Sequence, residues 1–358
     1  MVIKYPVTLR KCKFRGDNTL NKKAVALLSG GLDSTLAIKL MLEQGVEVHA
    51  LNFLTVFCTC TSKGCRHQAT KVAEEFKVPI KVMNITEEYM EVVKNPKYPR
   101  GRNMNPCIDC RIFTFKKAKG FMDEIGASFV ITGEVAGQRP MSQRKQAILT
   151  IEKESGLKGL IVRPLSAKFF EPTIPEKEGI VNRDRLLDIQ GRRRNQQMAL
   201  AKEFNINDYP CPAGGCLLTD NGFSARLKDL LKYNAGYDIA DIHLLKIGRH
   251  FRISDKLKLV VGRDEKENEK LLSLIRPGDY IFDILDVPSP IGLARGRGGF
   301  ETLPYAQKDI ELMASIIARY SDAKTERTKV SYKILPSEEL KEVLACPATG
   351  SILSSLRI

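Results

Sequence analysis

The sequence has no tryptophan and only four histidines among 358 residues. No Ser/His/Asp set and no HExxH pattern is present, so neither a histidine base nor a zincin-type metal centre is indicated. No apolar run approaches the roughly 18 residues of a membrane span. The first residues also lack the apolar core of a signal peptide. We therefore expect a cytoplasmic protein that has no membrane partner.

Two widespread nucleotide-binding patterns are also missing. No glycine is followed directly by lysine, so the P-loop pattern GxxxxGK[ST] cannot occur, and GxGxxG is absent as well. Any nucleotide site must therefore use a different loop.

What the chain has is positive charge. Lysine and arginine total 57 against 42 acidic residues, which gives a net charge of +15. An excess of this size is typical of proteins that bind a polyanion, most often a nucleic acid. A basic protein that is merely soluble is the alternative.

The pattern of apolar runs predicts an α/β fold. Residues 23–53 read as a strand, a glycine turn, a helix and a second strand, and the alternation continues to about residue 134. Such repeats predict a parallel sheet with helices on both faces, followed by a smaller α+β module. The expected parts are an N-terminal extension (1–20), an α/β domain (21–185), a long basic helix with a second cysteine loop (186–235), the α+β module (236–322) and a loosely held polar tail (323–358).

The glycine turn has the sequence Ser29-Gly30-Gly31-Leu32-Asp33-Ser34. Glycines let backbone N–H groups close around phosphate oxygens, and the following helix adds partial positive charge at its N-terminus. The hydroxyls of Ser29 and Ser34 are further donors. An ordinary capped glycine turn is the alternative.

SGGLDS resembles the PP-loop of the N-type ATP pyrophosphatases, which have an adenine nucleotide alpha hydrolase-like fold. The resemblance implies that ATP and Mg²⁺ bind, that pyrophosphate leaves, and that AMP is attached to a substrate oxygen. It implies roles for Asp33 in placing Mg²⁺ and phosphates, for Asn52 and Phe53 beside the adenine, and for Gly133 and Gln138 in the nucleotide pocket.

Further segments resemble tRNA thiolation enzymes. TGEVAGQ at 132–138 is similar to 4-thiouridine synthetases, whereas NPCIDC at 105–110, RPL at 163–165 and the cysteine of PAGGCLLTD, Cys216, resemble tRNA 2-thiouridylases. The implied reaction adenylates a uridine carbonyl oxygen of tRNA and replaces it with sulfur from a cysteine desulfurase, a carrier or sulfide. Segments 260–272 and 279–292 resemble the NFACT-R module, which binds RNA.

The nine cysteines fall mostly into close groups. The resemblance implies catalytic roles for Cys107 and Cys216. It also supports a [4Fe–4S] cluster on Cys107, Cys110 and Cys216, with one iron open to a hydrosulfide. A persulfide relay between Cys107 and Cys216 and a structural zinc ion stay open, and Cys211 could replace Cys110 or Cys216.

A second group of soft ligands spans ten residues. Cys58, Cys60, Cys65 and His67 are of the types that hold Zn²⁺. A redox-quiet loop, or a thiol that passes sulfur inward, would give the same pattern. Cys12 and Cys346 are isolated and are expected to be inert.

Basic residues accompany these motifs, and we expect them to hold tRNA phosphates. Solvated helix faces are the alternative for each cluster. The clusters are Lys116, Lys117 and Lys119; Arg139, Arg144 and Lys145; Arg192, Arg193 and Arg194; and Arg295 with Arg297.

Two other functions fit parts of this pattern. One is a PP-loop enzyme that adenylates a small-molecule amide or sulfur compound. The other is a non-catalytic RNA-binding protein that retains the PP-loop as a scaffold.

Overall fold

A computed structural model describes residues 20–58, 65–209, 216–297, 305–323 and 325–358. Within these residues the chain forms two compact units. The first unit comprises residues 20–53, 65–83 and 111–209, and the second comprises 54–58, 84–110 and all described residues from 216 onward. Among the described helices, none is both long and apolar enough to cross a membrane.

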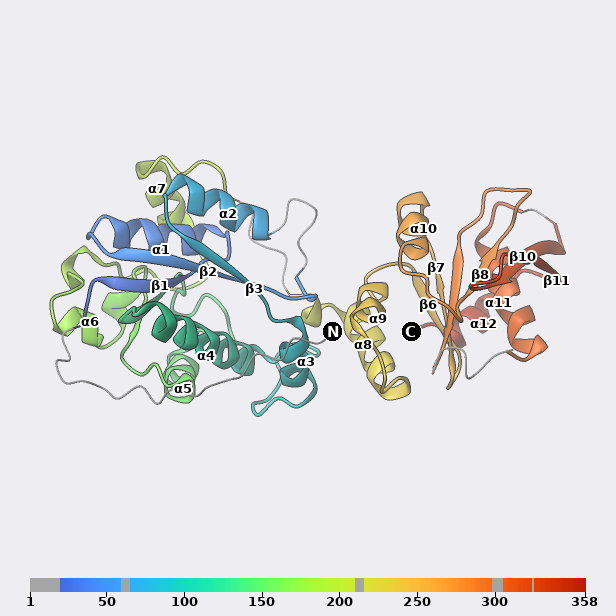
Figure 1. The fold of residues 1–358 in the computed structure, drawn as a ribbon, viewed down its shortest axis with the longest axis horizontal. Helices are drawn as coiled ribbons and strands as arrows, with labels where there is room; N and C mark the ends of the chain where they lie inside the picture. Colours follow the sequence, from blue (N-terminus) through green and yellow to red (C-terminus); the bar gives the residue numbers. More distant parts are fainter. Residues whose placement is uncertain (1–19, 59–64, 210–215, 298–304, 324) are drawn as a thin grey trace, which may run out of the picture. The chain divides into compact units, whose positions relative to one another are not determined.

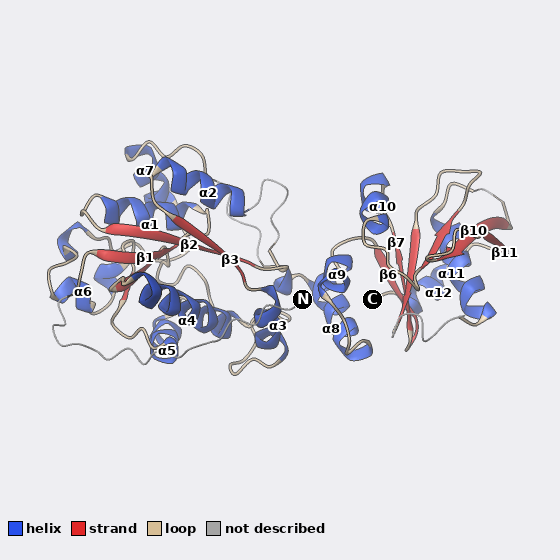
Figure 2. Cartoon of the chain, viewed as in Figure 1, coloured by secondary structure: helices blue, strands red, loops and turns tan. Residues whose placement is uncertain are grey.

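The first unit is built on a five-stranded sheet of order β3-β2-β1-β4-β5. β1 pairs in parallel with β2 and β4, and β4 pairs in parallel with β5. Figure 2 shows α1 and α2 on one face of this sheet and α4 and α5 on the other. The predicted α/β fold with helices on both faces is therefore confirmed. The strands are β1 (Lys23–Leu27), β2 (Glu47–Leu54), β3 (Ile80–Asn84), β4 (Phe129–Thr132) and β5 (Ile161–Val162), and the helices are α1 (Leu32–Leu42), α2 (Cys65–Glu75), α4 (Cys107–Ile125) and α5 (Lys145–Ser155).

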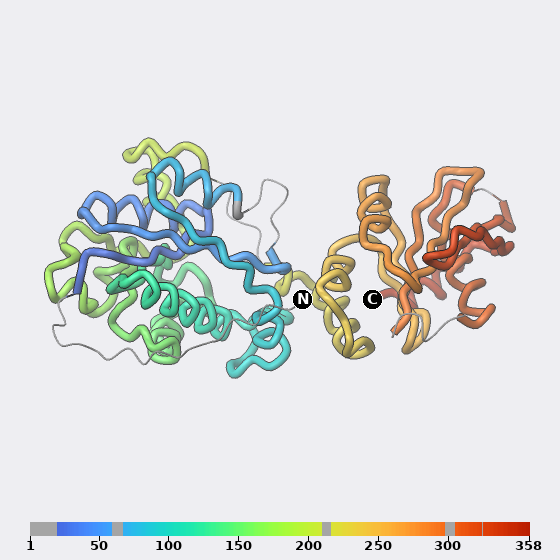
Figure 3. The backbone as a smooth tube through the Cα atoms, viewed as in Figure 1, coloured from blue at the N-terminus to red at the C-terminus, as the bar shows by residue number. Residues whose placement is uncertain are grey.

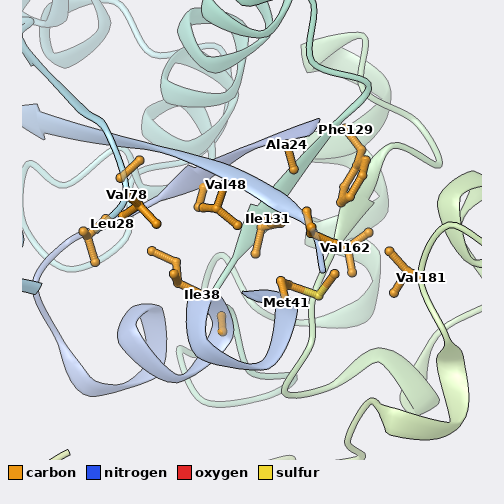
Figure 4. Packing of buried hydrophobic residues seen from close by; sticks show 14 of the residues in the cluster. Ala24, Leu28, Ile38, Met41, Val48, Val78, Phe129, Ile131, Val162 and Val181 are labelled. Carbon is orange, nitrogen blue, oxygen red and sulfur yellow. The ribbon is translucent and has the colours of Figure 1, made fainter. Parts of the chain in front are cut away.

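Burial on both faces explains why the central strands are continuous apolar runs rather than alternating ones. Ala24, Val25 and Ala26 of β1 are all fully buried. Figure 4 shows Leu28 and Met41 packed with side chains from neighbouring strands, including Val48 and Ile131. This core fixes the end of β1, from which the glycine turn leaves the sheet.

A second apolar cluster in the first unit joins α1 to α7 (Asn195–Glu203). Leu32 and Leu36 of α1 pack there with Ile189, Ala201 and Ile206. The prediction of a long basic helix from about residue 186 is wrong, because α7 begins only at Asn195. Gly191 has a φ of +83°, which is not helical, and Gln190 beside it forms an isolated β-bridge with Ala136. Shorter elements complete the unit: η1 (Ala167–Phe169), α6 (Ile174–Lys177) and the 3₁₀ turn η2 (Arg183–Arg185).

The second unit contains a six-stranded sheet of order β11-β10-β8-β9-β7-β6, paired antiparallel throughout. Figure 1 labels all of its strands except β9. The strands are β6 (Arg249–Ser254), β7 (Leu257–Val261), β8 (Tyr280–Asp283), β9 (Gly292–Gly296), β10 (Thr328–Ile334) and β11 (Lys341–Ala345). The helical segments are α3 (Thr86–Lys94), η3 (Leu217–Thr219), α8 (Asn221–Tyr233), α9 (Ile239–Leu244), α10 (Glu265–Leu272), α11 (Gln307–Tyr320) and α12 (Gly350–Leu356).

The polar segment expected to be a loose tail is part of this sheet. Residues 328–345 supply β10 and β11, and β10 pairs directly with β8 (Figure 3). Val330 and Tyr332 alternate with polar residues along β10 and pack into the core of the second unit. This alternation is a strand signal, which the overall polarity of the segment conceals.

Candidate functional site

The glycine turn between β1 and α1 is closed on itself by hydrogen bonds. Ser34 Oγ donates to the Gly31 carbonyl at 2.8 Å, and the Ser29 backbone N–H donates to Ser34 Oγ at 3.3 Å. Gly30 has a φ of +77°, which glycine adopts without strain. Gly31 is the N-cap of α1, and no side-chain hydrogen bond from a described residue caps this end. The first N–H groups of α1 are therefore available to an anion.

Gly133 lies against the backbone of this helix end. A Cβ at Gly133 would stand 2.5 Å from the carbonyl carbon and oxygen of Asp33 and from the nitrogen of Ser34. Only a glycine fits there without a backbone shift, because all three atoms belong to the peptide group between Asp33 and Ser34. The TGE segment therefore lies directly on the first turn of α1, as its predicted role in the nucleotide pocket requires.

Asp33 connects the turn to two other segments of the first unit. Gln138 Nε2 donates to Asp33 Oδ2 at 3.1 Å, and Arg194 Nη2 lies 3.7 Å from the same oxygen. Asp33 Oδ1 is buried and has no hydrogen-bond partner among the described residues. Asp33 and Gln138, which were predicted separately as site residues, are thus brought together, and Arg194 lies beside them.

Asn52 in β2 completes the group. Its Nδ2 donates to the Leu28 carbonyl at 2.7 Å, and its Oδ1 is buried without a partner in the described part of the chain. Phe53 follows it and is partly exposed. The strand end therefore offers an unused acceptor and an aromatic ring close to the start of the turn.

A buried carboxylate in the first unit has no counterpart in the sequence analysis. Glu134 accepts from Arg111 Nε at 2.8 Å and from Arg163 Nε at 3.1 Å. Burial raises the pKa of Glu134, but attraction by the two guanidinium groups outweighs it, so the net pKa is lowered. The ion pairs hold Glu134 charged and rigid next to Gly133. The TGE and RPL segments contain Glu134 and Arg163, but nothing in either motif shows that these residues pair or that Arg111 joins them.

The second unit brings several thiols together. Cys107 and Cys110 lie in the first turn of α4, and Cys216 directly precedes η3. Two backbone hydrogen bonds hold the loop around Cys216: Leu217 N–H to the Phe57 carbonyl at 3.0 Å, and Met104 N–H to the Leu218 carbonyl at 3.1 Å. The first of these places Cys58, the residue after Phe57, beside Cys216.

The phenol of Tyr89 marks the centre of this thiol group. Its pKa is raised by burial first, then by the charge of Cys110 and a hydrogen bond with it, and also by Cys216 and Cys107. Burial likewise raises the pKa of Cys216 to about 12, with Cys110, Cys58 and Cys107 adding to the shift. The Leu218 backbone N–H opposes it by favouring the thiolate. The three predicted cysteines therefore lie close together, and Cys58 is a fourth member.

The predicted zinc set lies partly outside the described residues. Cys60 and the side chain of Cys65 belong to that part, as do Cys12 and Cys211. Cys58 instead accompanies Cys216, with Thr55 Oγ1 at 3.6 Å from its Sγ, and His67 is exposed. Considering described residues alone, no group of three or more His, Cys, Asp or Glu side chains is arranged to hold a single metal ion.

The predicted basic clusters differ in exposure. Arg295 is buried, and its guanidinium binds Asp279 at 2.6 Å and Asp241 at 2.9 Å, so its prediction as a phosphate contact is wrong. Arg295 and the glycine that follows it, Gly296, belong to strand β9. Lys117, Lys119 and Arg194 are half-buried. The remaining members are exposed: Lys116, Arg139, Arg144, Lys145, Arg192, Arg193 and Arg297.

Family models match two separate stretches of the chain. Residues 22–155 match the family model of the tRNA methyl transferase HUP domain, and residues 248–353 match that of the NFACT protein RNA binding domain. The tRNA-specific 2-thiouridylase MnmA of Geotalea uraniireducens is 32% identical over 139 residues, covering 33% of this chain and 36% of the relative. MnmA 1 of Caldanaerobacter subterraneus subsp. tengcongensis is 26% identical over 249 residues, covering 64% of this chain and 65% of the relative.

A solved 4-thiouridine synthetase–RNA complex with bound ATP aligns with 51% of each chain at 24% identity and a TM-score of 0.35. The chain spans only about a third of the length of the first curated relative (36%). Both resemblances drawn from the sequence, to PP-loop tRNA thiolation enzymes and to the NFACT-type module, are nevertheless confirmed. The chain is thus similar to the tRNA methyl transferase HUP domain family over residues 22–155 and to the NFACT protein RNA binding domain family over residues 248–353.

Proposed function

We propose that this protein is an ATP-dependent tRNA sulfurtransferase that makes a thiouridine. The observation that carries the proposal is the gathering of Cys107, Cys110 and Cys216 in a chain that also has the glycine turn Ser29–Ser34 at the start of α1. We infer that this turn binds phosphate and call it the phosphate-binding turn. Clustered thiols serve sulfur or soft-metal chemistry, whereas an enzyme that only adenylates a small amide has no use for them. The likeness to MnmA proteins and the NFACT-type domain favour tRNA as the substrate.

The first unit would activate the uridine. The uncapped N-terminus of α1 and the hydroxyls of the turn bind the ATP phosphates, while Asp33 positions Mg²⁺. Gln138 fixes the orientation of the Asp33 carboxylate through its 3.1 Å hydrogen bond. The uridine carbonyl oxygen attacks the α-phosphate, the bond to pyrophosphate breaks, and the oxygen becomes part of an AMP leaving group.

The thiols of the second unit would deliver the sulfur, and their chemistry fits an iron–sulfur cluster. Thiolates are the soft ligands that clusters require, and each ligand of a [4Fe–4S] cluster binds a different iron, so they need not surround one ion. A cluster held by Cys107, Cys110 and Cys216 would supply an iron with an open position for a sulfur ligand. The Leu218 N–H stabilises the thiolate form of Cys216, which metal binding requires.

Pyrophosphate release tests the function as a whole. Bulk tRNA is expected to stimulate release by the wild-type protein, and nucleoside mass spectrometry is expected to detect a thiouridine when a sulfur donor is added. Release without RNA would support adenylation of a small molecule. No release at all, with RNA still bound, would support a non-catalytic RNA-binding protein.

Iron and acid-labile sulfide analysis after anaerobic reconstitution tests the sulfur step. We expect Cys107→Ala, Cys110→Ala and Cys216→Ala each to lose iron and thiolation. Cys346→Ala removes an exposed thiol and is the matched control. If iron does not bind while a persulfide forms on Cys216 and activity persists, the relay between Cys107 and Cys216 is correct instead. Cys58→Ala retains iron if three ligands suffice and loses it if Cys58 is a fourth.

A further inference from the structure

Arg194 lies at the phosphate-binding turn although it belongs to a run of three arginines predicted to bind RNA. We propose that Arg194 is a phosphate ligand of the nucleotide site and that it pairs with Asp33 only while ATP and Mg²⁺ are absent. When they bind, the carboxylate of Asp33 would coordinate Mg²⁺, and the guanidinium of Arg194 would bind a phosphate oxygen instead. This inference rests on the proposed function only in requiring that the turn binds ATP.

The backbone around Arg194 is fixed to both sides of the site. Gly191 N–H donates to the Ala136 carbonyl at 2.8 Å, which ties the segment to the residues after Gly133. Arg194 itself is the N-cap residue of α7, and α7 packs against α1 through Ala201 and Leu36. The arginine is therefore held beside the first turn of α1 by main-chain contacts and by packing.

Arg194 does not satisfy its hydrogen-bonding capacity among the described residues. Its Nη2 lies 3.7 Å from Asp33 Oδ2, which is longer than a good hydrogen bond, while Gln138 donates to the same oxygen at 3.1 Å. Arg194 Nε and Asp33 Oδ1 are both buried and have no hydrogen-bond partner among described residues. Buried polar atoms of this kind are normally satisfied, so a ligand at the turn is expected to complete them.

The chemistry of the pair selects the ligand class. A guanidinium presents paired N–H donors that match two phosphate oxygens, and a carboxylate suits Mg²⁺. The side chains of Arg194 and Asp33 are 20% and 19% exposed, so solvent and a small ligand can reach them. A magnesium–polyphosphate satisfies both groups at once, which neither an amine nor a neutral nucleoside can do.

The neighbouring arginines supply matched controls. Arg192 and Arg193 are exposed, so their substitution removes the same charge without touching Asp33. We expect Arg194→Ala to weaken ATP–Mg²⁺ binding at least tenfold in titration calorimetry without RNA. Arg194→Lys keeps the charge but not the paired donors, so its affinity for ATP–Mg²⁺ should lie between those of the wild type and Arg194→Ala. Arg192→Ala should bind ATP within twofold of the wild type.

Two further measurements separate the possible failures. The melting temperature measured without ATP shows whether a variant is folded. If Arg194→Ala does not fold, Arg194→Gln replaces it in the ATP titration. The salt dependence of tRNA binding should be unchanged in Arg194→Ala. The inference would be overturned if a folded Arg194 variant kept the wild-type affinity for ATP. It would also be overturned if tRNA binding by that variant became less dependent on salt. If the wild-type protein binds ATP but releases no pyrophosphate in the presence of tRNA, the proposed function is overturned. The inference that Arg194 binds phosphate would still stand.

Discussion

Replacing Gly133 with alanine tests whether the TGE segment and the phosphate-binding turn act as one piece. The added Cβ would stand 2.5 Å from three backbone atoms of Asp33 and Ser34, and ordinary contact begins at 3.4 Å. The two segments must therefore separate by about 0.9 Å, the difference between these distances. No side chain can rotate away to relieve the contact, because all three atoms are main chain.

The expected cost follows from overpacking. Extra methyl groups in a packed interior cost about 1–3 kcal/mol of the free energy of unfolding. For a unit of this size each kcal/mol lowers the melting temperature by roughly 2–4 °C. Separation also moves the N-terminus of α1, so ATP should no longer stabilise the protein. In the wild type, ATP at about 100 times its Kd would contribute about 2.7 kcal/mol.

Thermal unfolding with and without ATP–Mg²⁺ measures both effects. Gly120→Ala is the matched control: it lies within α4, and nothing stands within 4 Å of its added Cβ. This control should gain up to about 1 kcal/mol from helix propensity and keep the full response to ATP. A Gly133→Ala protein with the wild-type melting temperature and an undiminished ATP response would refute the reasoning.

Three further predictions concern the second unit. Burial lowers the pKa of Lys258 to about 7 despite the nearby Asp229. The unfolded chain therefore binds more protons between about pH 7 and 10, so the free energy of unfolding in urea should rise with pH there; Lys258→Met should flatten that rise, and an unchanged slope would contradict it. Arg295→Met should cost about 3–5 kcal/mol of stability because it leaves Asp241 and Asp279 buried and charged, whereas Arg297→Met should change only the salt dependence of RNA binding; equal stabilities of the two would show the pairing to be unimportant. In metal-free protein, alkylation of Cys216 followed by mass spectrometry should rise about tenfold per pH unit from pH 8 to 10, because its pKa is raised to about 12; a plateau near pH 9 would contradict the burial.

The conformation of the glycine turn at residues 29–34 was predictable because its features are local. Six consecutive residues contain the glycines, the hydroxyls and the start of the helix, so spacing along the chain equals spacing in the fold. The sheet followed for a similar reason, since a strand buried on both faces must be apolar at every position. Both features can be predicted without knowing which distant segments come into contact.

Pairings between distant segments that the family resemblance does not cover could not be predicted. Glu134 takes its partners from α4 and from the residue after β5, and Cys58 meets Cys216 through a hydrogen bond between their neighbours. Nothing in the spacing of these residues distinguishes them from exposed acids and thiols. Arg194 shows the same limit, because three adjacent arginines are equivalent in sequence and only the path of the backbone separates them.

The apolar contact between α1 and α7 sets how short a working fragment of the first unit can be. A chain cut after residue 185, where the sequence places a domain boundary, would lose Ile189, Ala201 and Ile206. Leu32 and Leu36 would then face water beside the nucleotide site, and such a fragment should aggregate. A fragment of the first unit that folds by itself therefore has to continue at least to residue 206, so α7 is part of this unit and is not a linker.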